Sequence, residues 1–251
     1  MQARQVVPAR TIKRLARTLI RKRHMTTLTF ARVVTSLRKF YGDPTLPSVT
    51  DPFEQVLWEN VAYLADDEKR SAAFAALRKT AGTRPEDIMK AKPAALLTVT
   101  KMGGIVPELR AERLRQCAEI AQILLKGKLD EALGESLAKA RKTLRRFPTI
   151  GEPGADKILM FAGKYSVFGL ESNGLRVLLR LGFAQEQKNY SASYRLVQRA
   201  IADQLPKDCA ALVSAYQLLR KHGQELCKRS RPLCEECPLR DSCAYAATLR
   251  N

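Results

Sequence analysis

Apolar residues recur at spacings of three and four along most of the chain, which is the period of a helix with one buried face. The segments with this pattern are residues 53–65, 68–79, 111–126, 130–146, 155–163, 174–182, 193–204 and 208–222. Glycine, proline and aspartate mark the breaks between them, as at residues 151–154. No alternating pattern of useful length predicts a strand. The sequence therefore predicts an all-α protein with short connections.

The net charge of the chain indicates the kind of partner that it binds. The 251 residues include 44 Lys and Arg and 25 Asp and Glu, so the formal net charge is +19. Such an excess attracts polyanions. Nucleic acid is the first candidate partner, an anionic membrane surface is the second, and a solubility effect is the alternative reading. Neither a transmembrane run nor a secretory segment is found, so we expect a cytoplasmic, nucleoid-associated monomer without a membrane partner.

Residues 1–25 form a separate basic extension. Its first 24 residues contain eight cationic side chains and no Asp or Glu. The cationic residues are Arg4, Arg10, Lys13, Arg14, Arg17, Arg21, Lys22 and Arg23. Three interpretations stay open: an arm on DNA phosphates, an organellar transit peptide, or an artefact of a start site that belongs at Met25.

Four of the six cysteines crowd into residues 227–243 with the spacing C-x6-C-x2-C-x5-C. They are Cys227, Cys234, Cys237 and Cys243. This crowding is typical of a metal site rather than a disulfide framework, and it predicts a reducing compartment. Four thiolates can surround an iron–sulfur cluster or one tetrahedral zinc ion. The cations nearby should lower the pKa of these thiols; they are Lys228, Arg229, Arg231 and Arg240.

A turn rich in proline and glycine joins a basic helix to an apolar helix within residues 144–163. Backbone N–H groups at the start of a helix bind phosphate without reading the base sequence. We expect DNA contacts from this turn and from the rim of the cysteine loop; the candidates are Thr149, Gly151, Gly154, Lys157, Arg229 and Arg231. The alternative is an ordinary helix–helix connection with Lys157 facing solvent.

These motifs resemble the endonuclease III superfamily of helix–hairpin–helix proteins. The cysteine spacing is that of the family's iron–sulfur loop. Residues 147–155 are similar to its hairpin, Leu-Pro-Gly-Val-Gly-x-Lys-Thr-Ala, and residues 170–177 to its Leu-Asp-Gly-Asn-Val-x-Arg-Val stretch. The likeness runs from about residue 51 to residue 243.

The resemblance implies a [4Fe–4S] cluster and two helical domains with an active-site cleft between them. A six-helix barrel would span residues 55–165 and contain the helix–hairpin–helix at 137–163. The cluster domain would combine residues 26–54 with residues 166–251.

The resemblance also implies two catalytic carboxylates. Glu171 stands where the family has an aspartate that stabilises positive charge on the sugar. Glu59 stands where adenine-specific glycosylases have a catalytic glutamate. On an apolar helix beside Trp58, its pKa should be raised, so that it can donate a proton near pH 7. The residues expected to contact a flipped base or the sugar are Asn60, Tyr63 and Asn173.

Each carboxylate also has a structural alternative. Glu59 could pair with a basic residue of a neighbouring helix. Glu171 could interact with a helix dipole, although Ser172 or Asn173 is the better cap by residue type.

Pro153 stands where the family's lyase lysine belongs, and it carries no amine. The resemblance therefore implies a monofunctional DNA N-glycosylase that removes a damaged or mismatched base from double-stranded DNA without efficient strand cleavage. The alternative is a divergent relative that binds damaged or distorted DNA without excising a base. Pro153 and the Glu171 substitution both support this alternative.

Overall fold

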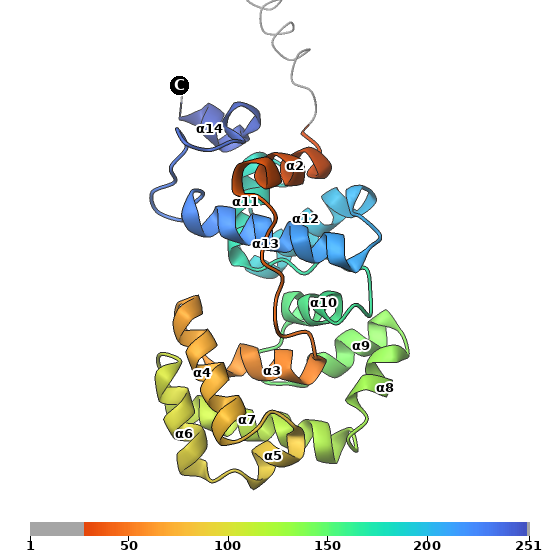
Figure 1. Cartoon of the computed structure of the whole chain (residues 1–251). Coiled ribbons are helices and arrows are strands. Elements are labelled where there is room, and N and C mark those ends of the chain that lie inside the picture. Colours follow the sequence, from red (N-terminus) through yellow and green to blue (C-terminus); the bar gives the residue numbers. More distant parts are fainter. Residues whose placement is uncertain (1–27, 250–251) are drawn as a thin grey trace, which may run out of the picture.

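The structure, a computed structural model, describes residues 28–249. The basic extension and the predictions made for residues 1–25 lie outside the described residues. The described chain forms two helical lobes, and helix α10 lies between them (Figure 1). No strand occurs in residues 28–249, where one isolated bridge joins Tyr63 to Gly104. The all-α prediction is confirmed.

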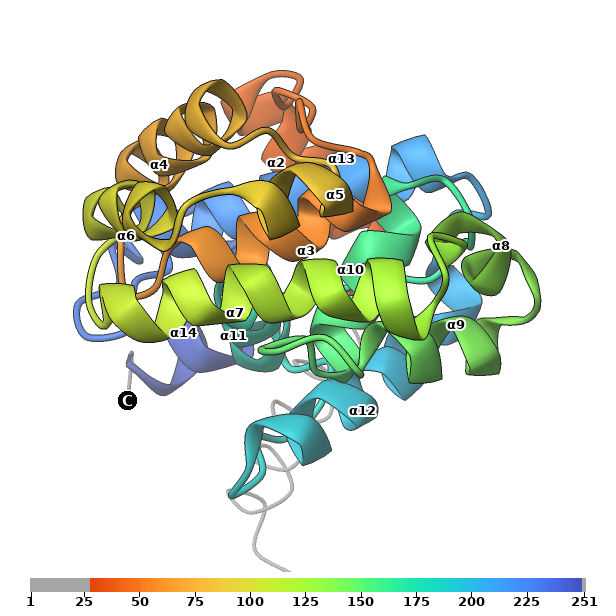
Figure 2. The ribbon, with the colours of Figure 1, turned by 90° about the horizontal axis from the view of Figure 1, so that it is seen from below.

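Helices α3 to α10 wrap around the core of the first lobe. They are α3 (Pro52–Val61), α4 (Asp67–Thr80), α5 (Pro85–Lys90), α6 (Pro93–Met102), α7 (Pro107–Glu119), α8 (Leu129–Gly134), α9 (Leu137–Leu144) and α10 (Glu152–Phe161). A π-helical turn, η1 (Ile120–Leu124), extends α7. Seen from below, α7 crosses the lobe in front of α3 (Figure 2). Phe53, Leu77 and Leu114 are buried in this core.

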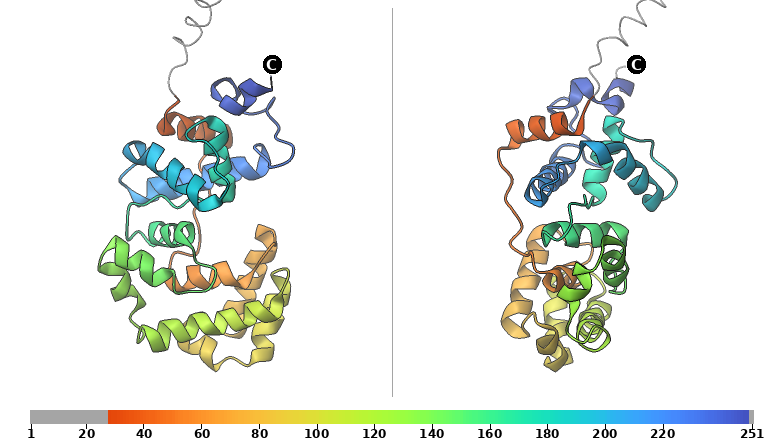
Figure 3. Two further views of the ribbon diagram at one scale, coloured as in Figure 1. Left: turned by 180° about the vertical axis from the view of Figure 1, so that it is seen from behind. Right: turned by 90° about the vertical axis from the view of Figure 1, so that its right-hand side faces the viewer.

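The second lobe combines an early helix with the last third of the chain. Its helices are α2 (Phe30–Tyr41), α11 (Ser172–Leu181), α12 (Tyr190–Ile201), α13 (Cys209–Glu225) and α14 (Ala244–Thr248), with short 3-10 turns η2 (Ala202–Gln204) and η3 (Arg240–Ser242). Helix α2 packs on α13, which also packs on α11 (Figure 3). Phe30, Phe168 and Leu219 are buried in this core.

Short polar side chains begin many of these helices. Each accepts a hydrogen bond from a backbone N–H of the first turn, which satisfies a donor that has no partner within the helix. These caps are Asp51 of α3, Asp66 of α4, Ser136 of α9, Asn189 of α12 and Asp208 of α13.

Helix α10 belongs to both cores. Ile158 is buried in the first core and Met160 in the second. Asp156, also buried, links the lobes: Arg141 Nε of α9 donates to its Oδ1 at 2.6 Å, and the Tyr194 hydroxyl of α12 donates to its Oδ2 at 2.7 Å. A buried carboxylate is stable only when its oxygens are paired in this way. The hairpin end of α10 is therefore held by both lobes.

The predicted helix over residues 53–65 ends earlier, at Val61. Ala62 adopts an extended conformation, and the Tyr63 N–H donates to Gly103 O at 2.9 Å instead of continuing the helix. A tertiary contact therefore ends this helix although the apolar pattern continues.

The other differences have local causes. The predicted helix over 130–146 is divided between α8 and α9, because Ser136 caps a new helix. Helices α5 and α14 have six and five residues, which is too short for a periodic pattern to appear. Helices α2 and α6 also lie outside the predicted segments, although α2 carries buried residues at helical spacing.

The two cores divide at a different point from the expected domain boundary at residues 54 and 55. Val49 and Phe53 lie in the core of the first lobe, so the segment that joins the lobes ends before residue 49. Among residues 28–249, no helix has both the length and the apolar character needed to cross a membrane.

Candidate functional site

Glu59 of α3 forms an ion pair with Lys157 of α10. Lys157 Nζ donates to Glu59 Oε1, and the two side chains are 12% and 28% exposed, respectively. Burial alone raises the pKa of Glu59, but the ion pair and hydrogen bond with Lys157, assisted by Arg70 and Arg220, lower it below its usual value. The expectation of a raised pKa is therefore wrong, and the alternative of pairing with a neighbouring helix is confirmed. Lys157 is engaged with Glu59, which corrects its placement toward phosphate or solvent.

Tyr216 and Arg220, one turn apart on α13, lie within electrostatic range of both Glu59 and Glu171. Burial raises the pKa of Tyr216 well above its usual value, and the negative charges of Glu171 and Glu59 raise it further. The Arg220 guanidinium interacts electrostatically with both carboxylates. Glu59, Lys157, Glu171, Tyr216 and Arg220 therefore form one coupled group with members from both lobes, which we call the interlobe site.

The Arg220 guanidinium is itself held across the lobes. It forms an ion pair with Asp67, the first residue of α4, and Gln224 Nε2 of α13 donates to the other oxygen of Asp67 at 3.3 Å. The first turn of α4 is thereby tied to α13 beside the interlobe site.

Glu171 is the N-cap of α11. Its Oε1 accepts a hydrogen bond from Gly174 N at 2.7 Å, and its Oε2 accepts one from Asn173 Nδ2 at 2.8 Å. The expected preference for Ser172 or Asn173 as the cap is thus corrected. Asn173 Oδ1 also accepts from Arg176 Nη2 at 2.8 Å, so the Asn173 amide bridges Arg176 and Glu171. Both oxygens of Glu171 are consequently oriented by the protein.

Gly169 brings the Glu171 segment against α10. A Cβ on Gly169 would lie 2.3 Å from Lys157 N and 2.4 Å from Lys157 Cα, so any larger residue would push this segment away. The close approach places the loop that leads to Glu171 directly on the turn of α10 that carries Lys157.

The hairpin turn between α9 and α10 depends on Asn60. Thr149 has φ +66°, a left-handed conformation that is unfavourable for a β-branched residue. Its hydroxyl donates to Asn60 Oδ1 at 3.2 Å, while Asn60 Nδ2 donates to Pro148 O at 3.1 Å and to Val56 O at 2.9 Å. Asn60 is 1% exposed, so its amide is committed to the turn. This corrects the prediction that Asn60 contacts a base.

The remaining predicted contact residues lie at or near the surface. Tyr63 is 52% exposed in the turn after α3. Gly151 is the exposed N-cap of α10, where no side chain of the described residues caps the first turn, and Gly154 is half-buried one turn later. Arg229 and Arg231 are exposed on the cysteine loop. A role for these residues in binding DNA stays a prediction.

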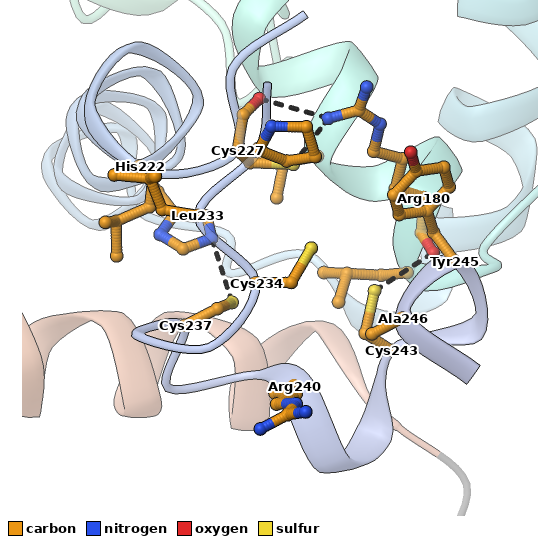
Figure 4. Close-up of a pocket in the computed structure, with 14 residues that line it drawn as sticks. Arg180, His222, Cys227, Leu233, Cys234, Cys237, Arg240, Cys243, Tyr245 and Ala246 are labelled. Carbon is orange, nitrogen blue, oxygen red and sulfur yellow. Dashed lines mark hydrogen bonds between the residues drawn. The ribbon is translucent and has the colours of Figure 1, made fainter. Parts of the chain in front are cut away.

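The four clustered cysteines line one cavity at the surface of the second lobe (Figure 4). In residues 28–249, no three His, Cys, Asp or Glu side chains converge closely enough to hold a single metal ion. The four thiols nevertheless line the same cavity. A set of four thiols suits an iron–sulfur cluster and also a tetrahedral zinc ion.

Side chains from two helices orient the cysteine loop. Arg180 of α11 donates from Nη1 to Cys227 Sγ at 3.4 Å and to Lys228 O at 2.7 Å. His222 of α13 contacts Cys237 Sγ through Nε2 at 3.5 Å and the Tyr41 hydroxyl through Nδ1 at 3.1 Å. Burial lowers the pKa of His222 to about 4. A neutral imidazole can donate to sulfur from Nε2 while Nδ1 accepts from the tyrosine.

Nearby cations do not lower the pKa of every thiol, contrary to expectation. Burial raises the pKa of Cys237 to about 11, and it also raises the pKa of Cys243. A metal bound in the cavity would stabilise the thiolate forms of these two residues.

Several residues of the interlobe site had no recognised signal in the sequence. Lys157 lies one helical turn after Pro153, and Tyr216 and Arg220 share one face of α13. These spacings are visible in the sequence, but they indicate only that residues share a helix face. The partners of that face come from helices distant in the chain.

Comparisons with known proteins agree with these observations. A family model described as the iron-sulfur binding domain of endonuclease III matches residues 227–243. The endonuclease III of Thermotoga maritima is 26% identical over 196 residues, covering 78% of this chain and 84% of that protein. The endonuclease III of Sulfolobus acidocaldarius is 24% identical over 194 residues, covering 77% of this chain and 82% of that protein.

Solved structures share the fold at lower sequence identity. A non-covalent complex of endonuclease III with DNA aligns with a TM-score of 0.68 and 19% identity, over 89% of this chain and all of the solved chain. A thermostable thymine-DNA glycosylase aligns with a TM-score of 0.65 and 18% identity, over 87% of this chain and 97% of the solved chain.

The role of Asn60 in the hairpin predicts a large loss of stability on Asn60→Asp. The substitution replaces the amide that donates to Val56 O and Pro148 O with a buried carboxylate, which should lower the free energy of unfolding by more than about 2 kcal/mol. Urea unfolding followed by circular dichroism measures the loss. Thr149→Val is the control, because it removes only the Thr149 hydroxyl and should cost about 1 kcal/mol. An unchanged midpoint for Asn60→Asp would show that the hairpin does not depend on this amide.

Proposed function

This chain belongs to the endonuclease III-like helix–hairpin–helix superfamily, and from that membership we propose that it is a DNA N-glycosylase that hydrolyses the bond between a damaged or mismatched base and its deoxyribose. The observation that carries the proposal is the interlobe site, in which Glu59 and Glu171 come from different lobes and both interact with Tyr216 and Arg220. When two carboxyl groups have different surroundings, one can donate a proton while the other stabilises a developing positive charge.

Glu171 is the proposed stabiliser of the sugar. When the base leaves, positive charge develops on the deoxyribose, and an oriented carboxylate lowers the energy of that transition state. Hydrogen bonds from Gly174 N and Asn173 Nδ2 hold both oxygens of Glu171, so little reorganisation is needed when the charge appears. Glu171 is longer by one methylene than the family's aspartate. The contact of Gly169 with Lys157 and the capping geometry define where its carboxylate lies.

Glu59 is the proposed proton donor to the leaving base. Its pairing with Lys157 makes the ionised form the resting state, and the protonated form becomes populated only toward acidic pH. Removal of the Lys157 ammonium takes away the charge that favours the ionised form of Glu59, so the pKa of Glu59 should rise.

In this proposal, the protein holds DNA at the interlobe site through contacts with the DNA phosphates. The turn before α10 presents Gly151 without a side-chain cap, and Arg145 and Arg146 are exposed at its start. Backbone N–H groups with neighbouring guanidinium groups bind phosphates independently of base sequence. The net charge of +19 favours the same partner.

The cysteine cavity is the proposed site of a [4Fe–4S] cluster held by Cys227, Cys234, Cys237 and Cys243. The family match over residues 227–243 and the four sulfurs around one cavity support this assignment. When bound, the cluster would hold the loop of residues 227–243 together through its four cysteines. Arg180 and His222 would then orient Cys227 and Cys237 through the contacts that they already make.

A second candidate function is damage-specific DNA binding without excision. The Glu59–Lys157 ion pair and the capping role of Glu171 favour it, because each carboxylate already has a structural task. An excision screen on duplexes with different modified bases, read after alkaline cleavage, separates the two functions. Tight binding of distorted duplexes with no excision of any base would establish the second.

For the cluster, we expect the purified protein to be brown, with broad visible absorption and stoichiometric iron and sulfide. Cys237→Ser should remove the colour and most of the soluble protein, because a four-ligand site loses one ligand. Cys209→Ser is the control, since Cys209 lies on α13 outside the cavity lining, and it should retain the absorption. A colourless native protein with one zinc ion per chain would refute the cluster assignment.

For catalysis, we expect Glu171→Gln to lower the single-turnover excision rate by about 100-fold or more, because it removes a charge but little volume. Binding to a duplex with a stable abasic-site analogue should change little. The exposed Glu186→Gln is the control with the same loss of charge. Excision that persists in Glu171→Gln would place the stabilising charge elsewhere.

The wild-type product should be an intact strand with an abasic site that breaks only in added alkali. Strand cleavage by β-elimination needs an amine that attacks the sugar, and Pro153 supplies none. Borohydride reduction during the reaction should therefore trap no protein–DNA adduct. An adduct that is lost in Lys157→Met would contradict the monofunctional proposal and identify Lys157 as the attacking amine.

The Glu59–Lys157 pair also predicts a pH dependence. If protonated Glu59 drives excision, the wild-type rate falls as pH rises through a lowered pKa. Lys157→Met removes the ammonium, so burial raises the pKa of Glu59 and activity should extend to higher pH. Glu59→Gln should abolish this dependence in both backgrounds. Rate profiles from acidic to neutral pH measure the shift, and superimposable profiles for wild type and Lys157→Met would refute proton donation by Glu59.

A further inference from the structure

His222 of α13 contacts two of the clustered cysteines. Its carbonyl oxygen accepts a hydrogen bond from Cys227 N at 2.8 Å, and its side-chain Nε2 lies 3.5 Å from Cys237 Sγ. Figure 4 shows the imidazole at the edge of the cysteine cavity, with the contact to Cys237 drawn as a dashed line. The imidazole is thus held against one sulfur, while the backbone of the same residue holds the start of the loop.

The other ring nitrogen of His222 meets α2. The side chain is 1% exposed, so both ring nitrogens need partners within the protein. Nδ1 lies 3.1 Å from the hydroxyl of Tyr41, the last residue of α2, which is 181 positions away in the chain. A continuous line of hydrogen-bonding groups therefore runs from Cys237 through His222 to α2.

Several contacts hold Tyr41 in this place. Gly42 N donates to Arg38 O at 2.8 Å and ends α2 directly after Tyr41. The Phe40 ring packs edge-on against the Tyr41 ring with 4.8 Å between centroids, and Lys221 Nζ lies 5.0 Å from the centroid of the Tyr41 ring. Burial raises the pKa of Tyr41, so its hydroxyl keeps its proton at neutral pH. Tyr41 is therefore a fixed hydrogen-bond donor beside His222.

The metal-bound state of Cys237 determines the direction of both hydrogen bonds. A cysteine that ligates a metal is a thiolate, so its sulfur can only accept a hydrogen bond. The proton between the sulfur and His222 must then belong to Nε2. A neutral imidazole carries a proton on one nitrogen alone, so Nδ1 has a free lone pair that accepts from the Tyr41 hydroxyl. Tyr41 thus selects the tautomer of His222 that donates to the sulfur.

We propose that Tyr41 and His222 are positioning residues for the iron–sulfur cluster, in which Tyr41 selects the His222 tautomer that donates from Nε2 to Cys237 Sγ, and that this hydrogen bond raises the reduction potential of the cluster. The proposal rests on the cluster assignment made under the proposed function, and not on base excision. A hydrogen bond to a sulfur ligand stabilises negative charge, and the reduced form of a cluster carries more of it. The hydrogen bond therefore makes it harder for an oxidant to remove an electron from the cluster.

Arg180 serves a different sulfur without this dependence. Its Nη1 donates to Cys227 Sγ at 3.4 Å, and a guanidinium presents N–H donors in every state. The imidazole of His222, in contrast, presents either a donor or a lone pair to Cys237. Its hydrogen bond can consequently be removed by a change at Tyr41, which leaves every atom that touches a cysteine in place.

The experiment compares Tyr41→Phe with the wild type in the full-length, cluster-loaded protein. The substitution removes one hydroxyl and keeps the ring that packs on Phe40. Without that hydroxyl, His222 also populates the tautomer whose Nε2 lone pair faces the sulfur. Voltammetry should show a potential lower by about 59 mV, which is a tenfold rise in the ratio of oxidised to reduced cluster at a fixed applied potential for a one-electron couple. The iron and sulfide content should stay that of the wild type.

Tyr190→Phe is the matched control. The Tyr190 hydroxyl donates to Leu170 O at 3.0 Å, and this tyrosine does not line the cysteine cavity, so its variant should keep the wild-type potential. His222→Phe should also lower the potential. Adding Tyr41→Phe to His222→Phe should lower it no further, because Tyr41 acts only through the imidazole.

Nuclear magnetic resonance tests the tautomer directly. The chain has two histidines, His24 and His222, so labelling of histidine with heavy nitrogen gives two sets of ring signals, and His24→Gln assigns them. Long-range proton–nitrogen correlations should show the His222 proton on Nε2 in the wild type. They should show a mixture of both tautomers in Tyr41→Phe.

A wild-type His222 with its proton on Nδ1, or an unchanged potential in iron-loaded Tyr41→Phe, would overturn the proposal. If Tyr41→Phe does not retain the cluster, an unchanged potential in His222→Phe would overturn it, and if neither variant retains the cluster, the wild-type tautomer decides. A wild-type protein purified without iron would refute the cluster assignment together with this inference. An iron-loaded protein that shows the predicted shift but excises no base would refute the proposed glycosylase function and leave this inference standing.

Discussion

Helix α10 has to satisfy two hydrophobic cores at once, and much of the rest of the arrangement follows from that constraint. Ile158 faces the first core and Met160 the second. Because one rigid helix belongs to both lobes, the residues on its exposed turns have defined positions relative to each lobe. Asp156 strengthens the connection by accepting hydrogen bonds from α9 and from α12. Helix α10 therefore fixes the position of the hairpin that precedes it and of the Lys157 ammonium that it carries.

The interlobe site is a consequence of this sharing. Lys157 extends from α10 to Glu59 on α3, while the segment of Gly169 packs on the backbone of Lys157 and leads to the cap of α11. Charges from both lobes thus converge within a partly buried region, where the interactions between them are stronger than at the surface. The Glu59–Lys157 pair makes the ionisation of one carboxylate depend on a residue of another helix.

Sequence reasoning succeeded where the determining contacts are local. The four cysteines that line one cavity fall within 17 residues, and the apolar periodicity of the longer helices is a property of each segment alone. Sequence reasoning failed where the conformation or ionisation of a residue depends on a partner far away in the chain. Asn60 meets Pro148, and Glu59 meets Lys157 98 residues away. The pKa of Glu59 follows its partner rather than the apolar helix on which it lies. The end of α3 at Val61 likewise depends on Gly103.

The division of the second lobe has a consequence for how the chain folds. The core of the first lobe is made from the continuous stretch between Val49 and Leu159. Helix α2, in contrast, packs against residues that are synthesised much later, in the last third of the chain. Arg38 donates to Ser214 at 2.8 Å, and Phe30 N donates to Gln204 at 2.8 Å. During synthesis the first lobe can therefore collapse on the ribosome while α2 still exposes Phe30, Val33 and Leu37. We therefore expect the second lobe to close last, because its contacts span most of the chain.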